Sequence, residues 1–271
     1  MVSRVRPVRI AVLNLMPFKE VTEADFLRLL KGVSTPVEVA WMRLRTHVSK
    51  HTSAVYMESR YRYFDELRQE RFDGFIVTGA PVELIDFEEV DYWEELRQIF
   101  DWAHASVRST LYICWGAQAG LYHFFGVPKY ALPRKVFGVF GQHVLSAALL
   151  LKGFPKEFPM PHSRHTEIRR GDLERHADLE ILAESPISGV SMAMTADARE
   201  VFITGHLEYE PYTLDNEYRR DLGKRDDVDL PKNYYEADDP SRKPVDSWHE
   251  WALRLYENWT SLYLAKERQD A

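Results

Sequence analysis

The chain has 271 residues, 45% of them hydrophobic and 13% aromatic, which is enough for a large core in one or two domains. Its 35 Lys and Arg against 42 Asp and Glu give a net charge of -7, which argues against a nucleic-acid-binding surface. A single cysteine excludes an internal disulfide and suits a reducing cytoplasm, and no apolar run approaches the length of a membrane span. Because the sequence shows neither zinc-type Cys/His spacing nor a phosphate loop, we expect no metal and no bound cofactor.

The first 125 residues alternate between buried runs of strand type and amphipathic runs of helix type. Strands are predicted at residues 8–15, 36–42, 72–78 and 109–113. Helices are predicted at 22–30 with Thr22 as the cap, at 61–68, at 90–106 and from Gly116 onward, with a loop at 45–60. This alternation is typical of an α/β domain whose mostly parallel sheet is flanked by helices. Such sheets bind ligands at the carboxyl ends of their strands, where Asn14, Gly79 and Cys114 are expected.

The pattern changes after Gly126. Short strands separated by polar turns are predicted at 136–145, 166–168, 179–183 and 190–194, and we expect them to form a small antiparallel addition at one side of the main sheet. A buried strand at 201–204, a helix at 212–222, a charged loop at 226–244 and a C-terminal helix at 248–265 follow. Since no convincing linker interrupts the chain, residues 1–271 are predicted to form a single domain.

Cys114, the only cysteine, falls where the strand 109–113 must turn into the helix that starts near Gly116. A thiol on such a tight turn is exposed at the sheet edge and faces the positive end of the helix, which favours the reactive thiolate. The arrangement is that of a nucleophile elbow with Cys in place of Ser. The alternative is that this lone cysteine is only a small buried hydrophobe.

His206 and Glu208 lie just past the strand at 201–204, at the edge where Cys114 is also expected. The order Cys, then His-x-Glu after a later strand, is typical of a Cys–His–Glu triad, in which His moves the proton and Glu holds one imidazole tautomer. A satisfied core histidine is the alternative, because the chain has ten His. The combination of one elbow cysteine with His-x-Glu at a strand end favours the catalytic interpretation.

Six stretches carry a resemblance to a known family. They are IAVLNLMP (10–17), FLRLL (26–30), DGFIVTGAPVE (73–83), CWGAQAGL (114–121), PHSR (161–164) and TGHLEYEPYTL (204–214). On these motifs, which span nearly the whole chain, the sequence resembles the homoserine O-acyltransferases of the MetA type, whose fold is that of the class I glutamine amidotransferases. Amidotransferases usually flank the nucleophile as Gly-x-Cys-x-Gly. Here Tyr112 occupies the first glycine position, which favours the acyltransferase.

The resemblance implies a covalent mechanism. Cys114 matches the family's thioester-forming nucleophile, and His206 and Glu208 match its other triad members. Attack of Cys114 on an acyl-CoA carbonyl would leave an acyl-enzyme, which the acceptor hydroxyl would then attack with His206 as base. The N–H groups of Trp115 and of the Gly79–Ala80 turn are the expected oxyanion donors.

Other matched positions concern the two substrates. By the resemblance, Lys135, Ser163 and Arg220 contact the amino-acid acceptor, and Arg220 can hold its α-carboxylate as a fork. Without the resemblance these residues would be a surface lysine, a turn serine and part of a solvated charge cluster. Glu83 matches a position that influences the choice of acyl-CoA, where Glu goes with acetyl and Gly with succinyl. The resemblance thus implies transfer from acetyl-CoA to L-homoserine in methionine biosynthesis.

Several alternatives remain open at this point. Succinyl-CoA could replace acetyl-CoA as donor, and L-serine could replace homoserine as acceptor. A glutamine amidotransferase-like cysteine hydrolase is more remote, because ammonia transfer needs a synthase domain for which the chain has no room. The intact Cys114, His206 and Glu208 disfavour a non-catalytic binding protein. The expected partners are small-molecule substrates, with no nucleic acid and no membrane. A homodimer is a further expectation. Family members usually carry a couple of dozen more residues before the first strand, and if that arm contributes dimer contacts or lines the site, the oligomeric state and the acceptor stay open.

Overall fold

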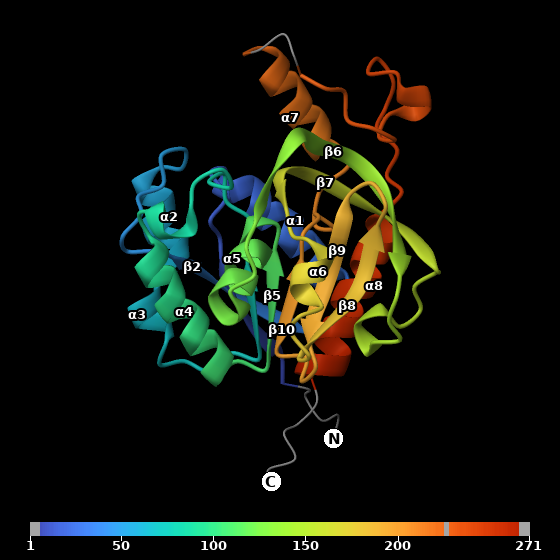
Figure 1. Ribbon diagram of the computed structural model, residues 1–271. Coiled ribbons are helices and arrows are strands. Elements are labelled where there is room, and N and C mark those ends of the chain that lie inside the picture. The colour runs from blue at the N-terminus through green and yellow to red at the C-terminus, as the bar shows by residue number, and fades with distance from the viewer. Residues whose placement is uncertain (1–5, 225–227, 266–271) are drawn as a thin grey trace.

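A computed structural model describes residues 6–224 and 228–265, and within them all ten strands join one sheet (Figure 1). The strands are β1 (Val8–Leu13), β2 (Val37–Arg43), β3 (Tyr61–Tyr63), β4 (Gly74–Val77), β5 (Ser109–Ile113), β6 (Tyr130–Val144), β7 (Glu157–Glu167), β8 (Leu179–Ser185), β9 (Gly189–Thr195) and β10 (Glu200–Ile203). Their order across the sheet is β3-β2-β1-β4-β5-β10-β9-β8-β6-β7. The chain therefore crosses over repeatedly in its first half, as α/β sheets require.

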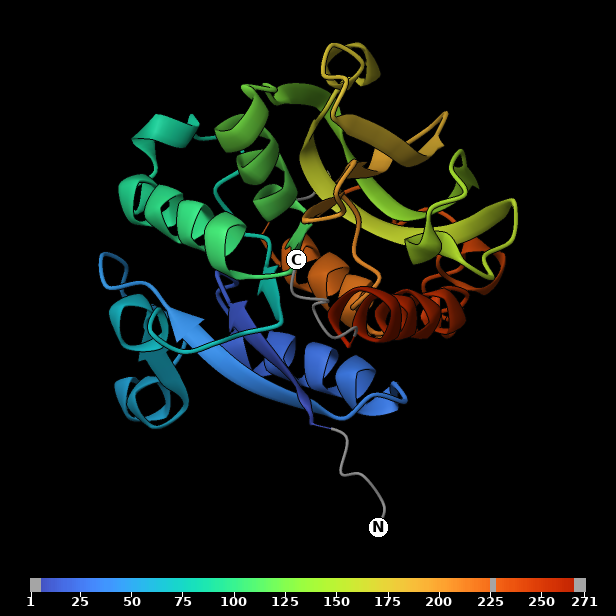
Figure 2. The ribbon, with the colours of Figure 1, turned by 90° about the horizontal axis from the view of Figure 1, so that it is seen from below.

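Helices cover both faces of this sheet. They are α1 (Lys19–Gly32), α2 (Ala54–Arg60), α3 (Phe64–Leu67), α4 (Trp93–Ser106), α5 (Trp115–Phe125), α6 (Arg170–Leu173), α7 (Thr213–Leu222) and α8 (His249–Asn258). Short 3-10 turns form η1 (Phe87–Glu89), η2 (Leu149–Leu151) and η3 (Glu236–Asp238), and the π-helix η4 (Trp259–Leu264) directly follows α8. Figure 2 shows α4 and α5 on one side of the central strands and α1 with α8 on the other. This layering confirms a mostly parallel sheet flanked by helices.

The parallel half comprises β3, β2, β1, β4, β5 and β10. Its central strands β4 and β5 are buried at every residue, which explains why the sequence shows continuous apolar runs there and not alternation. All six strands point the same way, so their carboxyl ends lie along one edge. The predicted strands at 8–15, 36–42, 72–78 and 109–113 are confirmed to within a few residues.

The antiparallel half is larger than the small addition predicted from the sequence. It contains β9, β8, β6 and β7, of which β6 spans 15 residues and β7 spans 11. Pro133, Pro159 and Pro161 lie inside these two strands and hide their alternation, and the β6–β7 register shifts between Ala131 and Val136. In Figure 1 this hairpin curves across the upper part of the molecule, with α7 above it.

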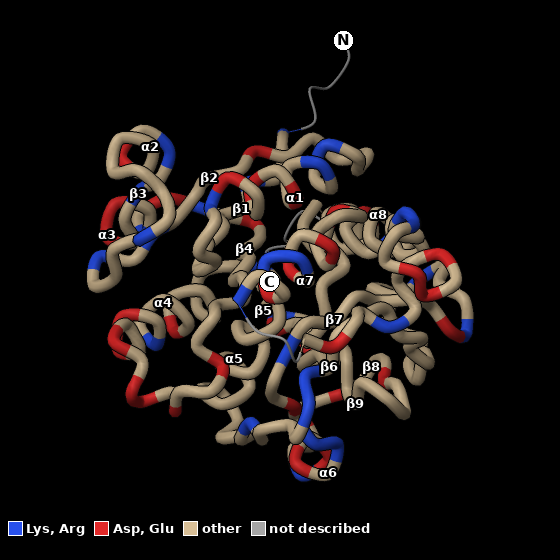
Figure 3. The backbone as a smooth tube through the Cα atoms, turned by 90° about the horizontal axis from the view of Figure 1, so that it is seen from above, with Lys and Arg blue, Asp and Glu red and all other residues tan. Residues whose placement is uncertain are grey.

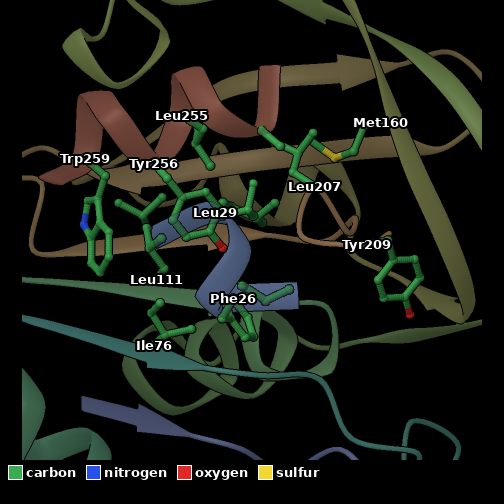
Figure 4. Packing of buried hydrophobic residues seen from close by; sticks show 14 of the residues in the cluster. Phe26, Leu29, Ile76, Leu111, Met160, Leu207, Tyr209, Leu255, Tyr256 and Trp259 are labelled. Atoms are coloured by element: carbon green, nitrogen blue, oxygen red, sulfur yellow. The ribbon is translucent and has the colours of Figure 1, made fainter. Parts of the chain in front are cut away.

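The core divides between the two faces of the sheet. On one face, Phe26 and Leu29 of α1 and Tyr256 of α8 pack against Ile76 and other strand residues (Figure 4). The other face packs against α4 and α5 through a second cluster. Full burial of each such large side chain contributes roughly 1.5–3 kcal/mol. The amphipathic helices thus fix the sheet whose edge carries the candidate site.

Several local predictions were wrong. Helix α1 begins at Lys19, so Thr22 lies inside it and is not its cap. Residues 61–68 form β3 and α3 in place of one helix, and α2 occupies part of the predicted loop at 45–60. These three short elements carry too little periodicity to be separated by sequence pattern. Within residues 228–244 the structure has the short turn η3 and two isolated β-bridges, at Lys232 and between Tyr235 and Pro244, while part of the predicted loop at 226–244 lies outside the described residues.

Candidate active site

The carboxyl ends of four neighbouring parallel strands meet at one edge of the sheet. Asn14 follows β1, Gly79 closely follows β4, Cys114 follows β5, and His206 closely follows β10. Because β1, β4, β5 and β10 are consecutive in the sheet, these residues come together although they span almost two hundred positions in the chain. The shared edge predicted for Asn14, Gly79 and Cys114 is therefore confirmed.

Cys114 occupies a strained turn between β5 and α5. Its backbone has φ 54° and ψ -116°, a region that non-glycine residues rarely adopt and that costs about 1–3 kcal/mol. Hydrogen bonds on both sides hold it there: its N–H donates to the Ile203 carbonyl at 2.7 Å, and its carbonyl accepts from the Ala117 N–H at 3.0 Å. The strain presents the thiol at the start of α5, as expected of a nucleophile elbow.

Glycine is required where α5 meets the neighbouring strand. A Cβ at Gly116 would lie 2.7 Å from the Thr78 carbonyl oxygen and 3.0 Å from that of Val77, both backbone atoms that cannot move aside. A Cβ at Gly79 would lie 3.2 Å from the Cβ of Cys114. The turn after β4 therefore runs directly against the nucleophile, and a side chain at position 79 would be tightly packed against Cys114.

His206 and Glu208 form a buried pair beside this thiol. His206 Nδ1 lies 2.7 Å from Glu208 Oε1, and the two residues are 2% and 6% exposed. Burial opposes the charged imidazolium, but Cys114 and Glu208, through charge and hydrogen bonding, together raise the pKa of His206 well above its ordinary value. Because Nδ1 faces the carboxylate, Nε2 is the nitrogen available to the Cys114 thiol. The structure thus assembles the three residues predicted as a triad.

The loop that carries this pair is fixed from several directions. The His206 N–H donates to the Pro161 carbonyl at 2.8 Å, and the Tyr209 ring stacks on the imidazole with centroids 4.1 Å apart. The Trp248 indole donates to the Tyr209 carbonyl at 3.0 Å, and Arg28 donates to the Glu208 carbonyl at 3.1 Å. The imidazole therefore has little freedom to turn away from the thiol.

The expected oxyanion donors lie next to Cys114. Trp115 is the first residue of α5, so its N–H has no carbonyl partner within that helix. Gly79 and Ala80 form the turn that contacts Cys114 from β4, and Ala80 is buried. Their position suits the predicted role, but the role itself stays a prediction.

The three residues predicted to contact the acceptor meet at one carboxylate. Lys135 of β6 donates to Glu217 Oε1 at 2.5 Å, and Ser163 of β7 donates to the same oxygen at 2.6 Å. Arg220 of α7 has a guanidinium nitrogen 3.8 Å from that oxygen and donates to Asp221 at 2.9 Å. Seen from the α7 side, basic positions on α7 and β6 border the same region (Figure 3). Sequence reasoning missed Glu217, although it lies three residues before Arg220 on the same helix face.

Glu83 lies in the loop after β4, and its side chain contacts strand β7. Its Oε2 accepts from the His165 N–H at 2.9 Å and lies 3.4 Å from the Thr166 hydroxyl oxygen. The Thr166 hydroxyl is closer to Gln118 Oε1 of α5, to which it donates at 2.9 Å, one turn beyond Cys114. The carboxylate is therefore tied to the elements around the nucleophile and does not simply cap a solvent-facing loop.

A buried guanidinium near the nucleophile was also missed. Arg164 is 2% exposed and donates to the Thr166 carbonyl at 2.5 Å and to the Ser188 carbonyl, while its Nε has no partner among the described residues. Burial lowers the pKa of Arg164, and the nearby Cys114 opposes that shift. Its sequence signal was present in the PHSR motif, but nothing in the pattern showed that the side chain would be buried.

A cavity of about 210 Å³ opens beside Glu208. Its walls are Met16, Phe18, Val21, Thr22, Asp25, Thr78, Glu208, Tyr209, Thr213, Asn216, Glu217 and Arg220. Glu208 belongs to the predicted triad, and Arg220 belongs to the predicted acceptor set. The cavity therefore joins the two groups of residues, as a site for a small polar molecule would.

Two negative findings apply to the described residues alone. Residues 6–224 and 228–265 contain no group of three or more His, Cys, Asp or Glu placed to hold a metal ion. No helix in that part of the chain is both long enough and apolar enough to cross a bilayer.

A sequence model described as homoserine O-succinyltransferase matches residues 1–269, almost the whole chain. The chain belongs to this family. Its family membership makes it an acyltransferase, which confirms the predicted class of enzyme and the predicted resemblance.

Relatives in the family match over nearly the full length. The chain is 53% identical to a homoserine O-acetyltransferase of Parabacteroides distasonis, over 97% of this chain and 85% of the relative. It is 51% identical to one of Bacteroides thetaiotaomicron, over 97% of this chain and 87% of the relative, and 50% identical to one of Brevibacillus brevis, over 97% and 86%. The family description and these relatives thus name different acyl groups.

Solved structures of low identity share the fold. A glutamine amidotransferase from Thermotoga maritima superposes with a TM-score of 0.61 at 12% identity, covering 97% of this chain and 100% of that one. A glutamine amidotransferase from Methylobacillus flagellatus gives 0.60 at 13% identity, covering 98% and 99%. These neighbours confirm the class I glutamine amidotransferase-like fold predicted for this family.

Proposed function

We propose that this protein transfers an acetyl group from acetyl-CoA to the side-chain hydroxyl of L-homoserine, as a step of methionine biosynthesis. The observation that carries the proposal is the strained Cys114 beside the buried His206–Glu208 pair, next to a cavity that Arg220 also lines. The choice of homoserine and acetyl follows relatives near 50% identity that are named homoserine O-acetyltransferase. Acetyl-CoA is a co-substrate in this proposal, and no bound cofactor is invoked.

In the first half-reaction, the Cys114 sulfur attacks the thioester carbonyl of acetyl-CoA, and the carbonyl electrons move to oxygen. We propose that the N–H groups of Trp115, the first residue of α5, and of the Gly79–Ala80 turn beside Cys114 stabilise that oxyanion. Collapse of the tetrahedral adduct breaks the bond to the CoA sulfur, which leaves as a thiol after taking the proton held by His206. The acetyl group remains on Cys114 as a new thioester, so no co-reactant beyond the donor is needed.

In the second half-reaction, the homoserine hydroxyl attacks the acetyl carbonyl while His206 takes its proton. The adduct then expels the Cys114 sulfur, leaving O-acetylhomoserine and the starting enzyme. Glu208 keeps the imidazole in one orientation through both steps, because it accepts from Nδ1 and leaves Nε2 for the reacting atoms. One His–Glu pair thus serves both transfers.

The acceptor side of the cavity is proposed to bind the amino-acid backbone of homoserine. Arg220 is half-exposed there and can form two parallel hydrogen bonds with an α-carboxylate. Lys135 and Ser163 contact Glu217 in the free enzyme, and that carboxylate also faces Arg220. We propose that Lys135 and Ser163 act on the acceptor either directly or by holding Glu217 in place beside Arg220.

Donor choice is proposed to depend on Glu83. The carboxylate is anchored by the His165 N–H and lies close to the Thr166 hydroxyl near α5. A succinyl group carries a carboxylate beyond its reacting carbonyl, whereas an acetyl group ends in a methyl. An ionised Glu83 facing the acyl group would repel the longer donor and also occupy the space it needs.

The proposal extends to the state of the enzyme in the cell. We propose that residues 1–271 act as one acyltransferase domain in the cytoplasm, with small-molecule substrates and no nucleic-acid or membrane partner. A homodimer is proposed as its assembly. Light scattering at two protein concentrations tests this, and a mass equal to one chain at both would contradict it.

A matrix of donors and acceptors tests the proposed reaction. Acetyl-CoA and succinyl-CoA are each combined with homoserine and with serine, and the acylated product and free CoA are quantified. The highest kcat/KM is expected for acetyl-CoA with homoserine. A higher value for succinyl-CoA or for serine would replace the donor or acceptor in the proposal. Release of ammonia from glutamine with no acyl transfer would reject acyl transfer in favour of an amidotransferase-like hydrolase.

A further inference from the structure

Asp25 is a buried carboxyl group without a visible protein partner. It lies in α1, is 3% exposed, and its Oδ1 is buried with no hydrogen-bond partner among the described residues. The hydrogen bonds of the described residues include none to either of its oxygens. Its neighbours Phe26 and Leu29 fill the core (Figure 4), whereas Asp25 lines the cavity of about 210 Å³. A buried carboxyl group of this kind leaves its oxygens available to a ligand in the cavity.

The other acids that line this cavity already have partners. Glu208 pairs with His206 at 2.7 Å. Glu217 Oε1 accepts from Lys135 at 2.5 Å and from Ser163 at 2.6 Å. Among the described residues that line the cavity, Asp25 is therefore the acid with no hydrogen bond to either of its oxygens.

Arg28 forms no ion pair with Asp25 and is engaged with other partners. Arg28, one turn further along α1, forms an ion pair with Glu210, donates to the Glu208 carbonyl at 3.1 Å and lies 2.6 Å from His249 Nδ1. The other charged groups around Asp25 are the acids Glu208 and Glu210 and the ring of His206. Glu217 and Arg220 of α7 line the same cavity. The surroundings are thus rich in acids, which favours a cationic ligand.

We propose that Asp25 binds the α-ammonium group of the amino-acid acceptor, while Arg220 binds its α-carboxylate. The proposal rests on the proposed function and assigns a further specificity-determining residue to it. An acceptor such as homoserine is a zwitterion, and its two charges need opposite partners in one small cavity. Arg220 on α7 and Asp25 on α1 supply one of each from two walls of that cavity. The acceptor hydroxyl is then free to reach His206 and the acyl group.

The proposal predicts a proton release on binding. Burial, followed by Glu208 and Glu210, raises the pKa of Asp25 to about 8, so the carboxyl is mostly protonated near neutral pH in the free enzyme. An ammonium group beside it favours the ionised form, so binding expels a proton below pH 8. The KM for homoserine should therefore fall as pH rises from 6 to 8, by up to about tenfold per pH unit.

The experiment compares Asp25→Asn with the matched control Thr22→Val, which lies one turn earlier on α1 and lines the same cavity. Two acceptors are used, homoserine and its deamino analogue 4-hydroxybutyrate. Acetylation of Cys114 by acetyl-CoA alone is measured in parallel. Asp25→Asn should raise the homoserine KM by about thirtyfold or more, abolish its fall with pH, and leave both the 4-hydroxybutyrate KM and Cys114 acetylation unchanged. Thr22→Val should leave the preference for homoserine over 4-hydroxybutyrate intact.

Several results would overturn the assignment. One is an unchanged homoserine KM in Asp25→Asn; another is an equal rise for both acceptors. A slower acetylation of Cys114 that matches the loss with homoserine would show that Asp25 acts through Glu208 and His206. If Asp25→Asn does not fold, the wild-type enzyme still tests the assignment. Its KM for homoserine should fall between pH 6 and 8, whereas its KM for 4-hydroxybutyrate should not. Absence of Cys114 acetylation in wild type would instead reject the proposed function itself.

Discussion

The triad side and the acceptor side of the site are built in different ways. Cys114, His206 and Glu208 follow two neighbouring parallel strands, and backbone hydrogen bonds and close glycine contacts fix them. Lys135, Ser163 and Arg220 come from β6, β7 and α7 and meet at the side chain of Glu217. The first side depends on backbone geometry and the second on charge pairing. Changes on the first should therefore reduce chemistry, whereas changes on the second should alter substrate binding.

The largest expected effect comes from removing a triad residue. His206→Ala should lower kcat by about 10⁴-fold in both half-reactions, because it removes the proton carrier of each. Glu208→Gln should cost less, since the ring remains but loses its orienting charge. Stopped-flow measurement of CoA release and of acceptor transfer checks both steps. A loss confined to one half-reaction would show that His206 does not serve both.

Arg220→Ala tests the acceptor side. Loss of a charged hydrogen bond to the α-carboxylate costs roughly 2–5 kcal/mol, so the homoserine KM should rise by about thirtyfold or more while acyl-enzyme formation stays normal. Arg219→Ala is the matched control, because Arg219 donates to Asp215 at 2.9–3.0 Å and to the Pro240 carbonyl at 2.9 Å. Equal behaviour of the two variants would mean that Arg220 is only surface charge.

Substitutions of Glu83 test whether donor choice is separate from both the chemistry of the triad and acceptor binding. Like charges about 5 Å apart at an effective dielectric near 20 repel by roughly 3 kcal/mol, about a hundredfold in preference. Wild type should favour acetyl-CoA over succinyl-CoA in kcat/KM, and Glu83→Gly should shift toward succinyl-CoA. Glu83→Gln can keep accepting from the His165 N–H while losing the charge, so it separates repulsion from space. A wild-type preference for succinyl-CoA, or no shift in Glu83→Gly, would remove Glu83 from donor selection.

The last predicted effect concerns stability. The pKa of Asp25, raised to about 8 by burial and then by Glu208 and Glu210, lies above its unfolded value of 3.8. Between these values the folded state binds the extra proton, so wild-type stability should fall as pH rises from 4 to 8. Asp25→Asn lacks that titration and should gain stability relative to wild type, with a larger Tm difference at pH 8 than at pH 5. Each kcal/mol corresponds to roughly 2 °C. Equal differences at the two pH values would contradict the raised pKa.

The two sides of the site also differ in how much of them could be predicted from the sequence. The strands before Asn14, Gly79 and Cys114 are buried on both faces and stop abruptly, so both their existence and their ends are visible in the sequence. Strands β6 and β7 contain prolines and a register shift, so only fragments of them were predicted. Glu217 contacts Lys135, which lies 82 positions away in the chain, and no local sequence pattern predicts a contact at that separation. Asp25 falls on an ordinary amphipathic helix, and only its burial against the cavity distinguishes it.

The central claim is that Cys114 carries the acyl group between donor and acceptor. The most direct measurement is the intact mass of the enzyme, quenched after mixing with acetyl-CoA alone and again after addition of homoserine. The account predicts the added mass of one acetyl group, mapped to the peptide of Cys114 and lost as O-acetylhomoserine forms, with neither event in Cys114→Ala. Substantial transfer by Cys114→Ala, or turnover by wild type with no adduct on Cys114, would mean direct attack of the acceptor on acetyl-CoA and would contradict it.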